Sequence, residues 1–247
     1  MIPPREGDIT RVEAFSDGMI AFAATLLVVS LETPRTYDGL IDSLYGFIPF
    51  GLSFAALFLI WVVHTTLFRR FPLSDKLSLV LNGALLFTVL FYVHPLKFLA
   101  ASFASLFSPE RATVDIGTVG NLAGLFMLYA VGWMVVFTLF ALLYRRAWQT
   151  REALSLRPVE AYDAITWSRH YIGFVLAGAI SFVIAYLGIG VRWGLPGMAY
   201  ATIALFTRWN AKSRKPGRDA LATKVADHPQ LAYTGAIRTE DIQHLIR

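Results

Sequence analysis

The chain of 247 residues contains no cysteine, which excludes disulfide bonds, thiol catalysis and metal sites built on cysteine ligands. Charged residues are also scarce at 16%, whereas apolar residues reach 56% and aromatic residues 14%. Soluble domains typically carry about 25% charged residues. A soluble fold with so few charges would expose a large apolar surface and aggregate. The composition therefore predicts a membrane protein that crosses the bilayer several times.

Long stretches without any charged side chain mark the membrane-spanning segments. Four of them contain 20 or more residues: 43–68, 77–96, 116–144 and 170–191. An α-helix rises about 1.5 Å per residue, so about 20 residues cross the hydrocarbon core of roughly 30 Å. Two shorter stretches become spans when they are extended to Arg11 at one end of the chain and to Arg192 and Arg208 at the other. We expect an all-α membrane protein with six transmembrane helices, at about 11–33, 43–68, 76–96, 117–145, 166–190 and 192–209.

The distribution of basic residues predicts the orientation of these spans. With six spans both termini lie on one side of the membrane, and that side holds 18 of the 22 lysine and arginine residues. The opposite side holds the other four: Arg35, Lys97, Arg111 and Arg192. Because cytoplasmic segments carry the excess of basic residues, both termini are expected in the cytoplasm. The same excess explains the net charge of +5, so no nucleic-acid partner is expected.

The domain organisation follows from the last span. We expect one six-helix transmembrane domain over residues 1–211, followed by a basic and polar cytoplasmic tail over residues 212–247. The tail is too short to form a domain of its own, although it has room for short helical pieces.

Polar side chains inside a membrane are costly, and those of the first three spans share one depth. Counted from the charges that flank each helix, Asp17, His64 and Asn82 all lie about 7–9 Å from the cytoplasmic end. Ser16 precedes Asp17, and Trp61 lies on the same helix face as His64. We predict a hydrogen-bonded polar network that holds the first helix against the second and third, in which Asp17 accepts from His64, Asn82 or the Trp61 indole. The alternative is that each group reaches interfacial water separately.

Catalysis and metal binding receive little support from the same residues. Ser16 and Asp17 are adjacent on one helix and point about 100° apart, which suits a catalytic triad with His64 poorly. A nucleophile-elbow motif is absent. The five histidines are scattered, and no two of them stand four residues apart. We expect no enzymatic activity, no cofactor and no resident metal.

The first span contains a motif that resembles the signature of a known family. Residues 11–18 (RVEAFSDG), 25–28 (TLLV) and 32–34 (ETP) resemble the first helix of the transmembrane protein 175 family. The resemblance is specific over residues 11–34, fair to about residue 95, and topological beyond that. Because animal members carry two six-helix repeats and this chain carries one, it resembles the prokaryotic type.

The resemblance implies a homotetrameric potassium channel in the plasma membrane, with helix 1 of each copy lining a central pore. Phe22 matches the narrowest hydrophobic ring, where isoleucine or leucine is usual in the family. Thr25 matches a hydroxyl layer implicated in potassium preference, and Leu26 and Val29 match further pore-facing positions. The residues that match the family's structural polar network are Arg11, Ser16, Asp17, Trp61, His64 and Asn82.

The expected function is therefore a channel that selects potassium modestly over sodium, with permeant K⁺ as its only ion and the lipid bilayer as its surroundings. A ring of large apolar side chains excludes water when it is narrow, so an ion must lose part of its hydration shell there. No carbonyl selectivity filter is present in the sequence. Two alternatives remain: a proton-coupled secondary transporter that uses Asp17 and His64, and a non-conducting membrane scaffold. The missing inverted repeat argues against the transporter.

Overall fold

The computed structural model describes residues 11–29, 35–105 and 117–227. Within these ranges the fold is all-helical, as the sequence predicts. The long helices are α1 (Arg11–Val29), α2 (Tyr37–Arg70), α3 (Lys76–Ser105), α4 (Val119–Gln149), α5 (Pro158–Tyr186) and α7 (Thr202–Asp227). Three short pieces connect α5 to α7: η2 (Val191–Trp193), α6 (Leu195–Met198) and η3 (Ala199–Ala201).

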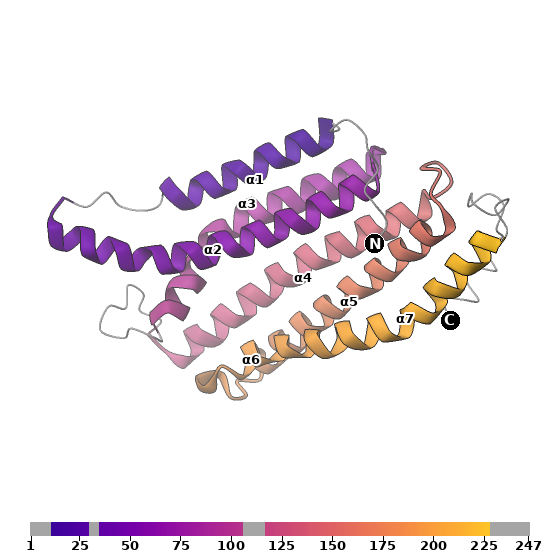
Figure 1. Cartoon of the computed structure of the whole chain (residues 1–247). Coiled ribbons are helices and arrows are strands. Elements are labelled where there is room, and N and C mark those ends of the chain that lie inside the picture. The colour runs from indigo at the N-terminus through magenta and orange to yellow at the C-terminus, as the bar shows by residue number, and fades with distance from the viewer. Residues whose placement is uncertain (1–10, 30–34, 106–116, 228–247) are drawn as a thin grey trace.

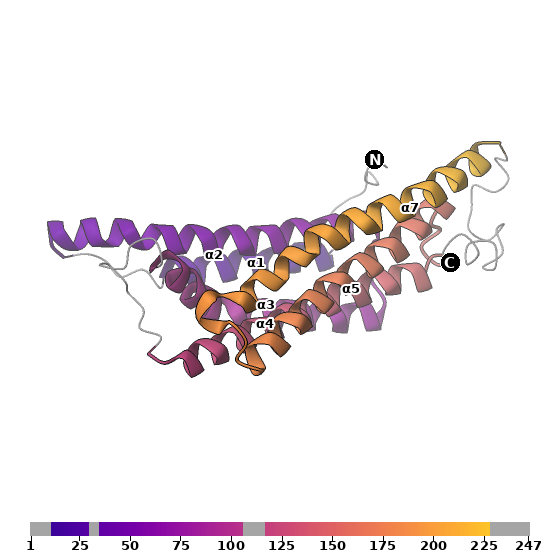
Figure 2. The same cartoon turned by 90° about the horizontal axis from the view of Figure 1, so that it is seen from below.

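The long helices form two layers that meet where α3 packs on α4 (Figure 1). In the first layer α1 lies against both α2 and α3. In the second layer α4 and α5 form the most extensive pair, and α7 packs on α5. Figure 2 shows this second layer running at a slant to α1 and α2. Among the described residues, α1 is therefore covered on one side only, by α2 and α3.

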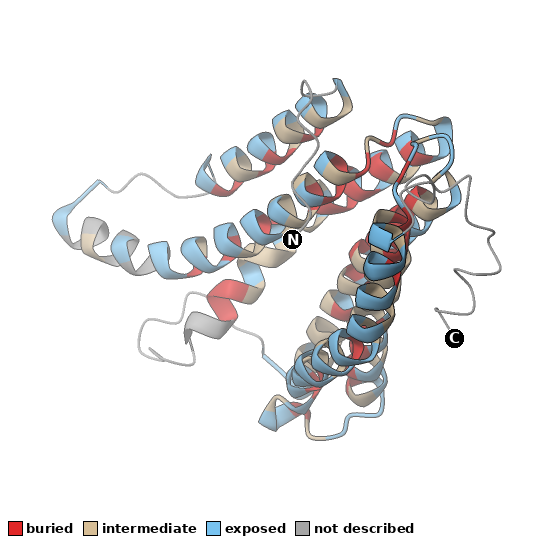
Figure 3. Ribbon diagram, turned by 45° about the vertical axis from the view of Figure 1, so that its right-hand side comes forward, coloured by how far each residue is buried: buried red, intermediate tan, exposed pale blue. Residues whose placement is uncertain are grey.

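Aromatic side chains fill the contact between the layers. Phe71, just after α2, meets Tyr144 of α4 edge-on, with 5.9 Å between the ring centroids. Tyr144 and Phe140 both pack on Tyr171 of α5. Buried residues concentrate on the facing sides of the helices, whereas the outer sides are exposed and largely apolar (Figure 3). Since lipid tails are as apolar as these side chains, close packing rather than removal from water holds the helices together.

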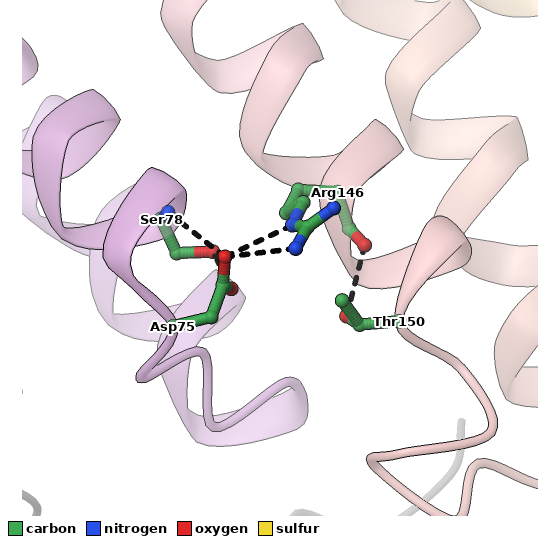
Figure 4. A network of polar contacts seen from close by, with 4 residues as sticks. All are labelled: Asp75, Ser78, Arg146 and Thr150. Carbon is green, nitrogen blue, oxygen red and sulfur yellow. Dashed lines mark hydrogen bonds and ion pairs between the residues drawn. The ribbon is translucent and has the colours of Figure 1, made fainter.

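An ion pair ties the two layers at one end of the molecule. The Arg146 guanidinium of α4 donates from Nε and Nη2 to one oxygen of Asp75, each at 3.0 Å, and the Ser78 hydroxyl donates to the other oxygen (Figure 4). Burial by itself would raise the pKa of Asp75, but the hydrogen bonds from Ser78 and Arg146 and the charge of Arg146 lower it below its ordinary value. The pair therefore persists in mild acid and is lost only as the pH falls through that lowered pKa.

Five of the described helices contain segments long and apolar enough to cross a membrane: Arg11–Val29, Phe47–Arg70, Lys76–Ser102, Val119–Gln149 and Pro158–Tyr186. Their bounds differ from the expected ones chiefly because helices continue past the charged residues. α2 begins at Tyr37 rather than 43, α3 passes through Pro95 and ends at Ser105 rather than 96, and α5 begins at Pro158 rather than 166. Charges mark where apolar stretches end, whereas a helix ends only where its backbone hydrogen bonds stop.

The expected sixth helix over residues 192–209 is wrong in its bounds. Gly190 and Gly194 adopt left-handed backbone conformations with φ of 58° and 68°, which L side chains rarely take, so the chain turns twice here. The regular helix starts only at Thr202. It then continues to Asp227, so the expected boundary between a membrane domain and a separate tail at residue 212 falls inside α7. Residues 228–247 of the expected tail lie outside the described residues.

A notch at Gly173 of α5, where no side chain is present, holds α7 against α5. The Phe206 ring of α7 occupies the space where a Cβ atom of Gly173 would stand. Further along, Leu221 packs against Tyr162, and Arg218 donates to Asp163 at 2.8 Å. Residues that come later in α7 contact residues that come earlier in α5, so the two helices are antiparallel.

The notch makes a prediction for stability. We expect Gly173→Ala to displace Phe206 and to lower the free energy of unfolding by about 1–3 kcal/mol, as overpacking usually does. Thermal unfolding of the detergent-solubilised protein measures the effect. Gly83→Ala on α3 is the control, because nothing lies within 4 Å of its added Cβ. Equal melting temperatures for the two variants would contradict the notch.

Candidate pore-lining helix and its polar network

α1 presents one narrow face to the rest of its own chain. Its buried residues are Ser16, Ile20, Ala23 and Leu27, which recur at the spacing of one helix face. Ile20, Ala23 and Leu27 join the main apolar core of the protein. Ala23 lets the neighbouring helices approach closely, as small residues do in membranes. This buried face sets the position of α1 against α2 and α3.

Three side chains from three helices form a buried chain of hydrogen bonds. The Asn82 amide of α3 donates from Nδ2 to the Ser16 hydroxyl of α1 at 2.9 Å, and Ser16 in turn donates to the Val12 carbonyl at 2.8 Å. His64 Nε2 of α2 lies 2.8 Å from Asn82 Oδ1. Because a carbonyl oxygen only accepts, His64 must carry its proton on Nε2. Ser16, His64 and Asn82 are 0%, 1% and 3% exposed, so these bonds are shielded from water.

Asp17 takes part through a separate bond. Its Oδ1 accepts from the Trp61 indole at 2.8 Å, while His64 pairs with Asn82. Of the three donors left open by the sequence, Trp61 is therefore the partner that the structure provides. The Trp61 ring also packs on Phe58, with 5.4 Å between the centroids.

These bonds fix the rotation of α1 as well as its position. Ser16 and Asp17 project about 100° apart. Because both residues bond to different neighbours, α1 can adopt only one rotation about its own axis. The face opposite the buried one is then exposed. It carries the residues that we call the exposed stripe of α1: Phe15, Gly18, Phe22, Thr25 and Val29. Phe15, Phe22 and Val29 are 62%, 54% and 73% exposed.

The exposed stripe contains three of the four residues that the sequence assigns to a pore. Leu26 differs, because it is half-buried and packs on the core at the edge of the stripe. Phe15 and Gly18 lie on the stripe and were missed by the sequence analysis, although Phe15 stands seven residues before Phe22 and so shares its face. Arg11 begins the helix and is exposed.

The Thr25 hydroxyl donates its hydrogen to a bond within α1. Its Oγ1 donates to the Ala21 carbonyl of the same helix at 3.0 Å. A hydroxyl oxygen has two lone pairs, so in this rotamer they remain available to a cation or to water on the exposed side. Within the described ranges, no group of three or more histidine, aspartate or glutamate side chains could hold a metal ion.

The fold and this helix define a multispanning membrane protein whose first helix is fixed by polar bonds on one face and open on the other. Residues 11–92 match the family described as "Endosomal/lysosomal potassium channel TMEM175". Over these residues the chain is similar to a family described as potassium channels. The match covers the three helices that form the polar network.

Relatives support the assignment over a larger part of the chain. A potassium channel of Marivirga tractuosa is 37% identical over 161 residues, which cover 62% of this chain and 65% of that protein. A potassium channel of Chamaesiphon minutus is 29% identical over 204 residues, which cover 76% of this chain and 91% of that protein.

Solved structures share the fold. A crystal structure of a variant of the potassium channel MtTMEM175, in complex with a nanobody–MBP fusion protein, matches with a TM-score of 0.75 and 29% identity. The match covers 85% of this chain and 97% of the chain in that crystal structure. The crystal structure of a lysosomal potassium-selective channel TMEM175 homologue from Chamaesiphon minutus matches with a TM-score of 0.50 and 26% identity, covering 81% and 96%. These matches bear out the resemblance to the TMEM175 family that the sequence predicts.

Proposed function

We propose that the chain is one subunit of a homotetrameric potassium-selective channel in the plasma membrane, with four copies of α1 around the pore. The observation that carries the proposal is the exposed stripe of α1, which the polar network turns away from the subunit's own helices. A stripe that mixes Gly18 and Thr25 with large apolar residues suits a pore wall, because the lone pairs of the Thr25 hydroxyl can meet a cation or water there. Relatives named potassium channels support the same assignment.

The ring of four Phe22 side chains forms the constriction in this proposal. It excludes water when narrow, and potassium crosses it more easily than sodium because potassium holds its hydration shell less tightly. Thr25, about one turn further along the stripe, replaces part of the lost water with its lone pairs. Val29 lines the pore beyond Thr25, and Leu26 borders it. Selection of this kind is modest compared with that of a carbonyl filter.

The proposal also includes a sixth membrane crossing, near the start of α7. The segment from Leu195 into the first turns of α7 returns antiparallel to α5, towards the side of the membrane where α5 began. An even number of crossings places both termini on one side, and the excess of lysine and arginine there assigns that side to the cytoplasm. The polar network of Ser16, Asp17, Trp61, His64 and Asn82 holds α1 to its subunit within this arrangement, and Arg11 stands at its cytoplasmic end.

The test is the reversal potential of reconstituted protein in opposing potassium and sodium gradients. We expect picoampere single-channel currents that reverse towards the potassium equilibrium potential. Slow transport without single-channel steps would identify a carrier, and the absence of any ion flux would identify a scaffold. Either result would overturn the channel.

The selectivity role of Thr25 is tested by the same measurement. We expect Thr25→Val to lower the potassium-to-sodium permeability ratio about two- to fivefold, which corresponds to losing roughly 0.5–1 kcal/mol of preference for potassium over the whole hydroxyl layer. Thr66→Val on α2 is the matched control, since its hydroxyl makes the same bond to the carbonyl four residues earlier and lies on another helix. An unchanged ratio in Thr25→Val would remove Thr25 from the selectivity layer.

A further inference from the structure

One exposed face of α7 changes from apolar to basic within three helical turns. Leu205, Trp209, Lys212 and Lys215 follow one another at spacings of three or four residues, Arg208 lies beside Trp209, and all five are exposed. Leu205 and Trp209 are large apolar residues that are 72% and 63% exposed. The face opposite to them packs on α5, as the contacts of Phe206 and Leu221 show.

From this face we infer a binding site for the headgroup of an acidic phospholipid in the cytoplasmic leaflet. Leu205 and Trp209 contact the acyl chains and the glycerol region, where tryptophan is enriched in membrane proteins. Arg208, Lys212 and Lys215 then meet the phosphate with complementary charge. Basic residues next to a membrane span attract anionic lipids in this way.

Among the described residues none of the three cations forms an ion pair, whereas Arg218 of the same helix is paired with Asp163. Arg218 donates to Asp163 from Nε and Nη2, and the Arg214 carbonyl accepts from the Tyr162 hydroxyl. These contacts hold the packed face of α7 on α5. Arg208, Lys212 and Lys215 are therefore presented together on a fixed helix rather than on a loose tail. Asp219 follows on the same face one turn after Lys215 and closes the basic patch on that side.

The combination of residues favours a lipid over an acidic protein. An acidic protein would meet the lysines but would gain nothing from Leu205 and Trp209, which lie where the apolar part of the chain ends. A lipid satisfies both halves of the face with one molecule, because its chains are apolar and its headgroup is charged. The inference is independent of the pore, since α7 lies in the other layer from α1 (Figure 1).

The test measures lipid retention by the full chain purified in neutral detergent. Dioleoylphosphatidylglycerol or dioleoylphosphatidylcholine is titrated in, and bound lipid is counted by native mass spectrometry. Each basic residue near an anionic surface contributes roughly fivefold to binding, so removing three lowers affinity for the acidic lipid on the order of a hundredfold. The variant carries Arg208→Gln, Lys212→Gln and Lys215→Gln.

The matched control removes the same charge from exposed residues elsewhere and carries Arg69→Gln, Arg145→Gln and Lys224→Gln. We expect it to bind the acidic lipid at least about tenfold more tightly than the site variant, because Arg69, Arg145 and Lys224 stand on three different helices and do not meet one headgroup. If both variants lose affinity for the acidic lipid equally, the effect is one of overall charge and the site is refuted. If the parent retains the two lipids equally, the site is likewise overturned. Displacement of the acidic lipid by millimolar inorganic phosphate would show that the patch recognises free phosphate and would also overturn it. If the triple variant fails to fold, Lys212→Gln alone should lower affinity about fivefold, and no loss would refute the proposal.

Discussion

Phe22→Ala is expected to open the constriction, raising the potassium current at least about tenfold and lowering the preference for potassium. Four benzyl groups leave the ring at once, so water fills the gap and ions pass with more of their hydration shell. A barrier lowered by only about 1.4 kcal/mol multiplies the rate of passage tenfold. Single-channel recording from reconstituted protein measures both the conductance and the reversal potential.

The control for this variant is Phe87→Ala on α3, which removes a phenylalanine that is also exposed, at 70% against 54% for Phe22, from a different helix. Its conductance and ion preference should match those of the parent. If Phe22→Ala also matches the parent, Phe22 does not form the narrowest point, and the assignment of α1 to the pore fails with it.

Asn82→Ala is expected to have the largest effect on stability. The change leaves the His64 Nε2 proton without its acceptor and the Ser16 oxygen without its donor, both in the protein interior. Each buried group left without a partner costs about 1–3 kcal/mol. Since the same bonds orient α1, we expect a lower melting temperature together with loss of the tetramer, measured by size-exclusion chromatography with light scattering.

Thr88→Ala on the same helix is the control for Asn82→Ala. The Thr88 hydroxyl is also largely buried, but it bonds only within its helix, to the Ala84 carbonyl at 2.7 Å. Its removal should lower the melting temperature slightly and leave assembly intact. An Asn82→Ala protein that stays tetrameric and melts like the parent would show that the network does not hold α1 in place.

The sequence predicts the depth of each polar residue better than its partner. Counting residues from the flanking charges places Ser16, His64 and Asn82 at one level, and the structure joins them there. The count contains no information on the rotation of each helix, so the pairing of Asp17 with Trp61 rather than with His64 required the packed structure. The half-buried state of Leu26 has the same origin, since it depends on where α2 and α3 lie around α1.

Helix bounds could be predicted where a helix and its apolar stretch begin at the same place, as α3 does at Lys76, and not elsewhere. Polar helix formers allow α5 to start at Pro158, well before its apolar stretch, and allow α7 to continue to Asp227. The turns at Gly190 and Gly194 depend on left-handed backbone conformations that composition alone does not reveal. The exposed face of α7 becomes visible only once Phe206 and Leu221 identify the packed face.

The hydrogen bonds of α1 lie near its N-terminal end, so a tilt of the helix would pivot about that end. Ser16 and Asp17 anchor the N-terminal half of α1 by hydrogen bonds, whereas Ile20, Ala23 and Leu27 hold the later part by apolar contacts. A tilt about this anchor moves Val29, more than twelve residues away, about twice as far as Phe22. In the proposed tetramer, a small tilt of all four copies of α1 would therefore widen the pore more at Val29 than at the Phe22 ring.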